Sequence, residues 1–311
     1  MPMYGKSFLK GDIMCMNNTD KNQTKAMSPV IMKGAPAAER LTEELKARSE
    51  KLRAGSVVPA LAILRVGSDP SDMAYERGAL KRAEKALVEI KSIVLPENAS
   101  EQDILAEIEK INADGSIHGC LMFRPLKNKE TEKRAAEMLD PKKDVDCMTL
   151  SSQAAVYTGS RECGFAPCTA EAVIELLKYY NIEISGKNTV VLGRSQVIGK
   201  PAAMLLLEEN ATVTVCHSKT KALEEICKKA DIIVAAMGRA EMISEEYLSV
   251  GQTIIDVGIN VGADGKMCGD VKESAKEAFA AKYTPVPGGV GSMTSTILMK
   301  HVIEAAERTV V

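Results

Sequence analysis

The strongest candidate for chemistry in this chain is a glycine-bearing loop, VVLGRSQVIGKP, over Val190–Pro201. An apolar strand runs into Gly193, a polar loop reaches Gly199, and a proline stands where a helix would begin. Gly193 permits a tight turn, Gly199 lets the helix pack close to the strand, and the helix N-terminus would offer free N–H groups to a diphosphate. The spacing G-x-S-x-x-x-G also fits an ordinary strand-to-helix turn, but the order strand, loop, helix favours a nucleotide.

The charges beside this loop indicate which nucleotide would bind. An NAD site usually has an acid roughly 20 residues after the first glycine, where it bonds the ribose hydroxyls. Here the second strand ends in Cys216, His217, Ser218 and Lys219, with no acid. Arg194 adds a cation, and a cluster of this kind suits a ribose 2′-phosphate, so we predict NADP as the cofactor. The alternative is that His217 and Lys219 form a solvated strand end.

A second glycine-rich segment, TPVPGGVGSMT over Thr284–Thr294, is typical of a loop that contacts a ligand. Its prolines stiffen the backbone, and its glycines allow close approach. The segment IIDVGIN, over Ile254–Asn260, is an apolar strand that runs into Gly258. Both glycine-bearing segments are therefore expected at the cofactor crevice, although neither identifies a reaction.

Composition excludes several other classes of function. The 40 Lys and Arg residues and the 42 Asp and Glu residues give a net charge of −2, too balanced for binding nucleic acid by bulk charge. Three His residues and eight Cys residues without a C-x-x-C pair predict no metal site and a reduced, cytoplasmic protein. Apolar stretches fall far short of the about 20 residues of a membrane span, so we expect no membrane partner.

The first 26 residues are polar and lack the pattern of a targeting peptide. We expect residues 1–26 to be a disordered extension, or to precede a start at Met27.

Helices and strands alternate through the first half of the chain. The predicted strands are 59–67, 90–95 and 117–123, and the predicted helices are 37–54, 72–89, 101–113 and 130–139. Such alternation indicates parallel strands joined by crossover helices, and therefore an α/β domain. Residues 140–169 break the rhythm and are interpreted as a hinge or a substrate-facing connection.

A second α/β pattern follows this break. A helix is expected over 169–182 with Thr169 as its N-cap. After it come predicted strands at 189–192, 212–216, 231–236 and 253–257, predicted helices at 201–209 and 221–230, and a last helix at 294–308. The pattern predicts a Rossmann-like, nucleotide-binding domain whose last helix packs back on the first domain.

Several motifs together resemble one family. VGSDPSDMAY, KKDVDC, VVLGRSQVIGKP, CHSKT, IIDVGIN, CGDV and TPVPGGVGSMT occur in the order and spacing of the methylenetetrahydrofolate dehydrogenase/methenyltetrahydrofolate cyclohydrolase family. The resemblance covers the chain from about Met27 to the C-terminus. It implies a homodimer with a folate-binding domain over 27–148 and 290–311 and an NADP-binding domain over 149–289.

The resemblance also implies roles for individual residues. Tyr75 and Asp146 match the catalytic residues that line the pocket and anchor the folate, although Cys147 stands where the family has glycine. The residues that match the loop beside substrate and nicotinamide are Pro287, Gly288 and Gly289. The residues that match the cofactor contacts are Gly193, Arg194, Ser195, Gly199, His217, Ser218 and Ile259.

Two departures from the family pattern concern the hydrolysis step. The bifunctional enzymes carry Y-x-x-x-K, but Ala79 stands four residues after Tyr75, and Phe123 replaces the glutamine of the family's G-I-L-V-Q-L-P strand. At about 100° per residue, position 79 lies about 40° from Tyr75 on a helix, whereas Lys81 lies about 240° round and is no easy substitute. Arg124 follows Phe123 and could pair with Asp146, with a substrate carboxylate or with solvent.

The sequence therefore predicts an NADP-dependent oxidation of 5,10-methylenetetrahydrofolate to 5,10-methenyltetrahydrofolate, with cyclohydrolase activity lost or weak. Hydride transfer requires mainly orientation and a dry site, whereas activation of water requires a group that manages protons. One alternative is a bifunctional dehydrogenase and cyclohydrolase, in which another lysine reaches the substrate. The other is a catalytically silent, nucleotide-binding subunit.

Overall fold

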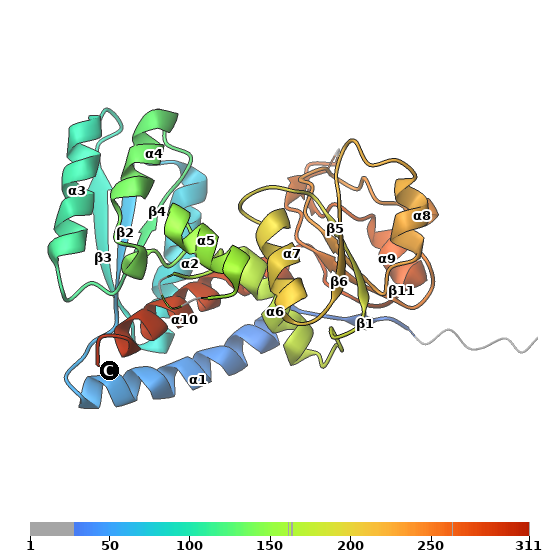
Figure 1. Cartoon of the computed structure of the whole chain (residues 1–311), viewed down its shortest axis with the longest axis horizontal. Coiled ribbons are helices and arrows are strands. Elements are labelled where there is room, and N and C mark those ends of the chain that lie inside the picture. The colour runs from blue at the N-terminus through green and yellow to red at the C-terminus, as the bar shows by residue number, and fades with distance from the viewer. Residues whose placement is uncertain (1–27, 161, 163, 263, 311) are drawn as a thin grey trace, which may run out of the picture.

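The computed structural model describes residues 28–310 apart from 161, 163 and 263, and these form two lobes, each built on a parallel sheet (Figure 1). The predicted disordered extension, residues 1–26, lies outside the described residues. Within the described part of the chain, no helix is both long and apolar enough to cross a membrane.

The first lobe contains a three-stranded parallel sheet in the order β3-β2-β4. Its strands are β2 (Ala60–Val66), β3 (Glu89–Leu95) and β4 (Gly119–Met122), and its helices are α2 (Pro70–Ala86), α3 (Glu101–Ala113), α4 (Lys129–Met138) and the 3₁₀ turn Pro141–Lys143. The central strand β2 is buried over nearly its whole length, which is the expected state of a continuous apolar run between two neighbours. The alternation predicted for the first half is confirmed.

The second lobe contains a six-stranded sheet in the order β1-β11-β8-β7-β5-β6, with every pair parallel. Its strands are β5 (Asn188–Leu192), β6 (Thr212–Cys216), β7 (Ile232–Ala235), β8 (Gln252–Asp256) and β11 (Ala280–Tyr283), with an antiparallel pair β9 (Asn260–Val261) and β10 (Met267–Cys268). Its helices are α7 (Gly199–Glu208), α8 (Leu223–Lys228), α9 (Glu273–Phe279) and the 3₁₀ turn Glu245–Tyr247. The strand order reverses at β5, which has β6 on one side and β7 on the other; ligands bind at such a switch point.

A two-residue strand at the start of the described chain belongs to this second sheet. Strand β1 (Val30–Ile31) pairs with β11, and the N–H of Met32 donates to the carbonyl of Tyr283 at 2.6 Å. The division expected from the sequence includes this segment in the first lobe. A two-residue strand has no periodicity of its own, and its partner lies about 250 positions away, so no local signal could place it.

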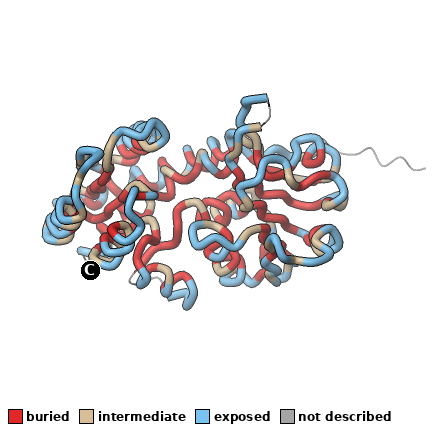
Figure 2. The backbone as a smooth tube through the Cα atoms, turned by 90° about the horizontal axis from the view of Figure 1, so that it is seen from above, coloured by how far each residue is buried: buried red, intermediate tan, exposed pale blue. Residues whose placement is uncertain are grey.

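The two lobes are joined by helices, the longest of which run beneath the first lobe and reach the second lobe at one end (Figure 1). The joining elements are α1 (Gly34–Ala54), α5 (Leu150–Thr158), α6 (Cys168–Tyr179), the 3₁₀ turn Val290–Ser292 and α10 (Thr294–Glu307). Helix α10 packs against α1, α2 and α6, so the predicted return of the last helix to the first lobe is confirmed. Buried backbone continues from each sheet into these helices, which makes one connected core across the junction (Figure 2).

One local prediction at the junction was wrong. Helix α6 begins at Cys168 after Pro167, without a side-chain cap, so Thr169 lies inside the first turn and is not the N-cap.

The stretch interpreted as a hinge or a substrate-facing connection, residues 140–169, contains helix α5, which the sequence did not predict. The signals of this helix are Thr149, whose hydroxyl accepts from Ser152 N–H at 3.1 Å, and the left-handed Gly159 at its C-terminus.

Candidate active site

A cavity of about 490 Å³ lies at the carboxyl ends of β5, β6 and β7, the position where a doubly wound sheet binds its ligand. Five residues predicted to contact the cofactor line it together: Gly193, Arg194, Ser195, His217 and Ser218. Other lining residues that the sequence did not single out include Thr220, Glu224, Arg239, Met242 and Tyr247. The structure therefore gathers most of the predicted cofactor residues in one place.

Gly193 and Gly199, the two glycines of the loop between β5 and α7, both lie tightly against neighbouring backbone, as their spacing predicts. Gly193 has φ +123°, a conformation that L side chains rarely adopt, and a Cβ there would clash with the carbonyl oxygen of Ala236 at the end of β7. A Cβ on Gly199 would clash in turn with the carbonyl of Gly193. Both glycines are needed for β5, β7 and α7 to approach one another around the cavity.

The expectation of free N–H groups at the start of α7 was wrong. Ser195 Oγ accepts from the N–H of Ile198 at 3.1 Å and from that of Gly199 at 3.3 Å, and the Ser195 carbonyl accepts from Lys200 N–H at 3.0 Å. The next residue, Pro201, has no N–H. This end of the helix is satisfied within the chain, so a phosphate would meet the loop and its side chains instead.

A tight turn fixes the orientation of His217. Its N–H donates to Thr220 Oγ1 at 2.8 Å, and its ring Nδ1 accepts from the N–H of Lys219 at 3.1 Å. Because Nδ1 accepts, Nε2 carries the proton of the neutral ring and is the side-chain donor available to a ligand. Of the residues predicted to hold a 2′-phosphate, Arg194, His217 and Ser218 line the cavity together, whereas Lys219 does not.

Two buried aspartates brace the loops beyond β7 and β8, and sequence reasoning did not identify them as site residues. Asp270 accepts from the N–H groups of Met237, Gly238 and Arg239 at 2.5 to 3.1 Å. Asp256, whose pKa burial raises, accepts from the N–H of Asp270 and lies 3.4 Å from the buried Lys276 ammonium. The sequence did contain a signal for them, because Asp256 lies in the motif IIDVGIN and Asp270 lies in the motif CGDV.

A smaller cavity of about 240 Å³ lies beside the second glycine-rich loop. It is lined by Ile259 together with Pro287, Gly288 and Gly289. Ile259 therefore lies with the predicted substrate loop and not in the 490 Å³ cavity. The start of α1 fixes this loop, because the N–H of Gly34 donates to the carbonyl of Gly288 at 2.8 Å.

The two residues predicted to be catalytic lie together at the junction of the lobes. The pKa of Tyr75 is raised by burial and by the nearby Cys168 and Asp146, so its phenol is neutral, and it hydrogen-bonds with Thr294 at the start of α10. The Asp146 carboxylate accepts from the N–H of Cys168 at 3.1 Å. Since Thr294 is the last residue of the second glycine-rich segment, Tyr75 connects the first lobe to that segment.

Apolar side chains lie beside Tyr75, at the two positions where the resemblance implies polar groups for hydrolysis. Ala79 is 0% exposed and faces the core from the same helix as Tyr75. The Phe123 ring packs edge-on against the Tyr75 ring, with 5.9 Å between centroids and 86° between planes. Lys81 is exposed, as its helical angle predicts.

Arg124 is the cation that acts on Asp146. Burial raises the pKa of Asp146, whereas the Cys168 N–H and the Arg124 guanidinium act to lower it. Arg124 also lines a cavity of about 760 Å³ in the first lobe, together with Phe123 and the acids Asp69 and Glu97.

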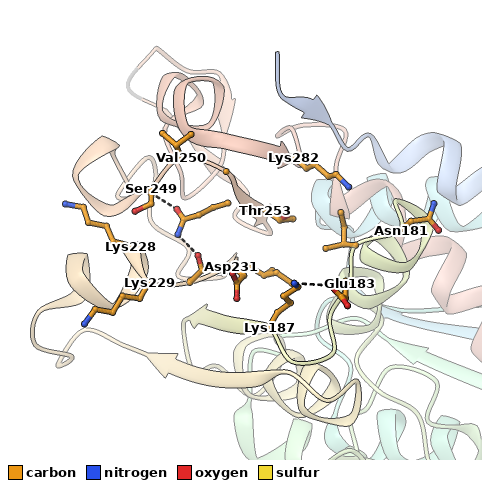
Figure 3. A pocket seen from close by; sticks show the side chains of 15 residues that line it. Asn181, Glu183, Lys187, Lys228, Lys229, Asp231, Ser249, Val250, Thr253 and Lys282 are labelled. Carbon is orange, nitrogen blue, oxygen red and sulfur yellow. Dashed lines mark hydrogen bonds and ion pairs between the residues drawn. The ribbon is translucent and has the colours of Figure 1, made fainter. Parts of the chain in front are cut away.

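A further cavity of about 470 Å³ lies at the opposite edge of the second sheet (Figure 3). Its lining includes Lys187, Lys228, Lys229 and Lys282, around the amino ends of β5, β7 and β8. Lys187 is paired with Glu183 at 2.9 Å. None of the predicted site residues lies there, and ligands of this sheet type bind at the carboxyl ends of the strands.

Comparisons with known proteins agree with this geometry. Residues 32–146 match the family model of the tetrahydrofolate dehydrogenase/cyclohydrolase catalytic domain, and residues 167–310 match that of its NAD(P)-binding domain. The bifunctional protein FolD of Carboxydothermus hydrogenoformans is 48% identical over 276 residues, covering 88% of this chain and 96% of that protein. The FolD of Clostridium botulinum strain Langeland is also 48% identical, over 89% of this chain and 98% of its own length.

Solved structures show the same likeness. The bifunctional FolD of Campylobacter jejuni superposes with a TM-score of 0.87 at 33% identity, covering 91% of this chain and 100% of that one. The Trypanosoma brucei enzyme, solved in complex with NADP and an inhibitor, superposes with a TM-score of 0.84 at 32% identity, covering 91% and 99%.

Proposed function

Because the chain belongs to the tetrahydrofolate dehydrogenase/cyclohydrolase family, we propose that it oxidises 5,10-methylenetetrahydrofolate to 5,10-methenyltetrahydrofolate with NADP, and that its hydrolysis of the product is lost or weak. The dehydrogenase activity and the cofactor follow from the family. The loss of hydrolysis is the specific part of the proposal. It rests on one observation, the apolar pair of Ala79 and Phe123 beside Tyr75.

The 490 Å³ cavity fits the dinucleotide. Gly193 lines it where β5 and β7 approach closely, and its lining also carries cations and hydroxyls. Arg194, the His217 Nε2–H and Ser218 would hold the 2′-phosphate, with Ser195 beside the diphosphate. When bound, NADP supplies the hydride acceptor.

The residues at the junction would orient the folate. Asp146 would accept hydrogen bonds from its pterin ring, and Tyr75 would offer a neutral ring and hydroxyl beside it. Pro287, Gly288 and Gly289 would bring the backbone close to the reacting carbon. The substrate's own nitrogen lone pair stabilises the cation left when hydride departs, so the protein needs to supply orientation and exclusion of water.

Hydrolysis makes a different demand, because a proton-managing group must reach the attacking water. A methyl group at position 79 and a phenyl ring at position 123 cannot donate or accept a proton. Asp146 remains, but the lysine and glutamine that accompany it in the family are both absent. The second candidate function is the bifunctional one, favoured by the names of the relatives that are 48% identical.

A paired assay on the purified protein separates the two. We expect NADP reduction with methylenetetrahydrofolate and decay of added methenyltetrahydrofolate at the buffer rate. The double variant Ala79→Lys, Phe123→Gln should retain NADP reduction and raise the decay above buffer, whereas Lys81→Ala, a change at an exposed lysine of the same helix, should alter neither rate. Hydrolysis by the wild-type protein well above the buffer rate would favour the bifunctional function, and NADP binding without reduction would favour a silent subunit.

The remaining expectations belong to the same proposal. We infer a cytoplasmic homodimer that acts on a small folate substrate without a nucleic-acid or membrane partner. The folate-binding lobe would comprise residues 27–148 and 290–311 and the NADP-binding lobe residues 149–289, with strand β1 contributed to the second sheet.

A further inference from the structure

A row of four charged side chains lies behind Asp146, and two of them, His301 and Glu171, are buried. His301 of α10 is 1% exposed; its Nδ1 lies 2.8 Å from the Val145 carbonyl and its Nε2 lies 3.1 Å from Glu171 Oε2. The Lys300 ammonium donates to Glu171 Oε1 and to Glu175 Oε1, each at 2.7 Å. The mechanism proposed above uses none of these four charged residues.

The acceptors determine the protonation state of the ring. A carbonyl and an ionised carboxylate can only accept, so both ring nitrogens of His301 must donate, and the ring is an imidazolium. Burial acts to raise the pKa of Glu171, but His301 and Lys300 beside it hold that pKa well below its usual value. Two cations and two carboxylates alternate along this row, so the four side chains together carry no net charge, which lowers the cost of removing them from water.

This row of charged side chains ends at the backbone next to Asp146. Val145 immediately precedes Asp146, and its carbonyl also accepts from the Cys168 thiol at 3.4 Å. The N–H of Cys168 is the donor to the Asp146 carboxylate. The imidazolium is itself held by stacking on the Phe165 ring, at 4.8 Å between centroids and 29° between planes. Segments from before α6, from α6 and from α10 thus converge on one peptide group.

We propose that His301 is a positioning residue, whose imidazolium fixes the Val145 carbonyl and thereby orients the Asp146 carboxylate toward the folate. The proposal rests on the proposed function, in which Asp146 contacts the substrate. A purely structural role would use the ring only as an ion pair that ties α10 to α6 through Glu171.

Two amide variants separate these roles. The amide nitrogen of Asn takes about the place of Nδ1 and that of Gln about the place of Nε2, so His301→Asn can keep the bond to Val145, and His301→Gln the bond to Glu171. We expect His301→Gln to raise the KM for methylenetetrahydrofolate about tenfold with kcat and the KM for NADP within about twofold of wild type, and His301→Asn to restore the KM. Equal KM values in the two variants, or the reverse order, would overturn the proposal.

The pH dependence provides a second readout if His301→Gln fails to fold. Around the ring lie Glu171 and Cys168 on α6 and Lys300 and Glu304 on α10, and Arg308 lies over the Phe165 ring. Burial lowers the pKa of His301, but Glu171 raises it above the ordinary value, so the ring donates both bonds at low pH. As pH rises through that pKa the ring loses one of its two N–H donors. The remaining proton stays on Nε2, which faces the ionised Glu171, and the bond to the Val145 carbonyl is lost.

Glu171→Gln keeps an oxygen acceptor and removes the charge, so the alkaline rise in the KM for methylenetetrahydrofolate should move to lower pH. Superimposable pH profiles would overturn the positioning role while leaving the proposed function intact. A wild-type protein that binds NADP but does not reduce it with methylenetetrahydrofolate would overturn both.

Discussion

At the scale of single residues, Asp146 shows how a local motif acquires its properties from distant groups. The motif KKDVDC predicts an acid at this position, and the structure surrounds it with the N–H of Cys168, the ring of Tyr75 and the guanidinium of Arg124. Burial favours the neutral acid, while the N–H and the cation favour the carboxylate. Burial and neighbours contributed by two other segments, at Cys168 and Arg124, therefore set its charge state, and no spacing rule contains that information.

Arg194 makes the cofactor preference testable at the same scale. Hydrogen bonds to a charged group contribute roughly 1.5–3 kcal/mol, so Arg194→Ala should raise the KM for NADP by about 10- to 100-fold and should change the KM for NAD far less. Initial rates with each cofactor at saturating folate give both constants.

Lys219→Ala is the matched control, because this lysine follows β6 directly after the cavity residues His217 and Ser218 but does not line the cavity itself. It should leave both constants within about twofold. Equal increases for NADP and NAD in Arg194→Ala would contradict the assignment of a 2′-phosphate site.

At the scale of elements, the loop between β5 and α7 was predictable in its backbone but not in its hydrogen bonds. Gly193 and Gly199 are required by close approach of neighbouring backbone, and glycine is the residue type that reports such a constraint in sequence. No comparable sequence signal shows that Ser195 accepts hydrogen bonds from the first N–H groups of α7. A capping residue normally stands directly before the helix, at Ile198 here, whereas Ser195 lies three residues earlier.

The difference between local signals and long-range contacts explains which other features the sequence could predict. Strands and helices of the repeating pattern were readable because apolar periodicity is local. Contacts such as His301 with Glu171 join residues 130 positions apart, so they exist only after the chain has folded. Helix α5 was readable from Thr149 and Gly159, but the polar composition around it obscured that signal.

The capping role of Ser195 predicts a local effect on stability. Ser195→Ala removes the acceptor of two N–H groups, a change that costs about 1 kcal/mol at helix starts, so amide exchange in the first turn of α7 should accelerate about fivefold without ligand. Hydrogen exchange measured by mass spectrometry on a peptide covering Ser195–Met204 checks this.

Ser218→Ala serves as the control, since Ser218 lines the same cavity without taking part in the start of α7. Its exchange in that peptide should match the wild type. Unchanged exchange in Ser195→Ala would show that the loop, and not the hydroxyl, holds the helix start.

At the scale of the whole molecule, the site is assembled from both ends of the chain. Helix α1 leaves strand β1 of the second sheet and runs beneath the first lobe, while α10 returns from the glycine-rich loop along the same path (Figure 1). Arg48 joins the two helices through a bidentate pair with Glu307 at 2.9 and 2.6 Å. The relative placement of the folate residues and the glycine-rich loop therefore depends on how these helices pack.

Gly34, at the start of α1, is the residue through which the packing of this helix contacts the glycine-rich loop. A Cβ on Gly34 would collide with the carbonyl oxygen of Gly289, so Gly34→Ala must displace either α1 or the loop. Overpacking of this kind costs typically 1–3 kcal/mol, and a displaced loop should also raise the KM for methylenetetrahydrofolate several-fold. Urea unfolding and steady-state kinetics on one preparation measure the two effects together.

Gly78 provides the opposite case within the same molecule. It lies in α2 with nothing within 4 Å of the place where a Cβ would be, so Gly78→Ala should stabilise the protein by about 0.5–1 kcal/mol through helix propensity alone and leave the KM unchanged. The two substitutions add the same methyl group to a helix, and only the one at the junction of the lobes should weaken the protein. If Gly34→Ala were as stable and as active as Gly78→Ala, the start of α1 would not be what holds the glycine-rich loop against the substrate site.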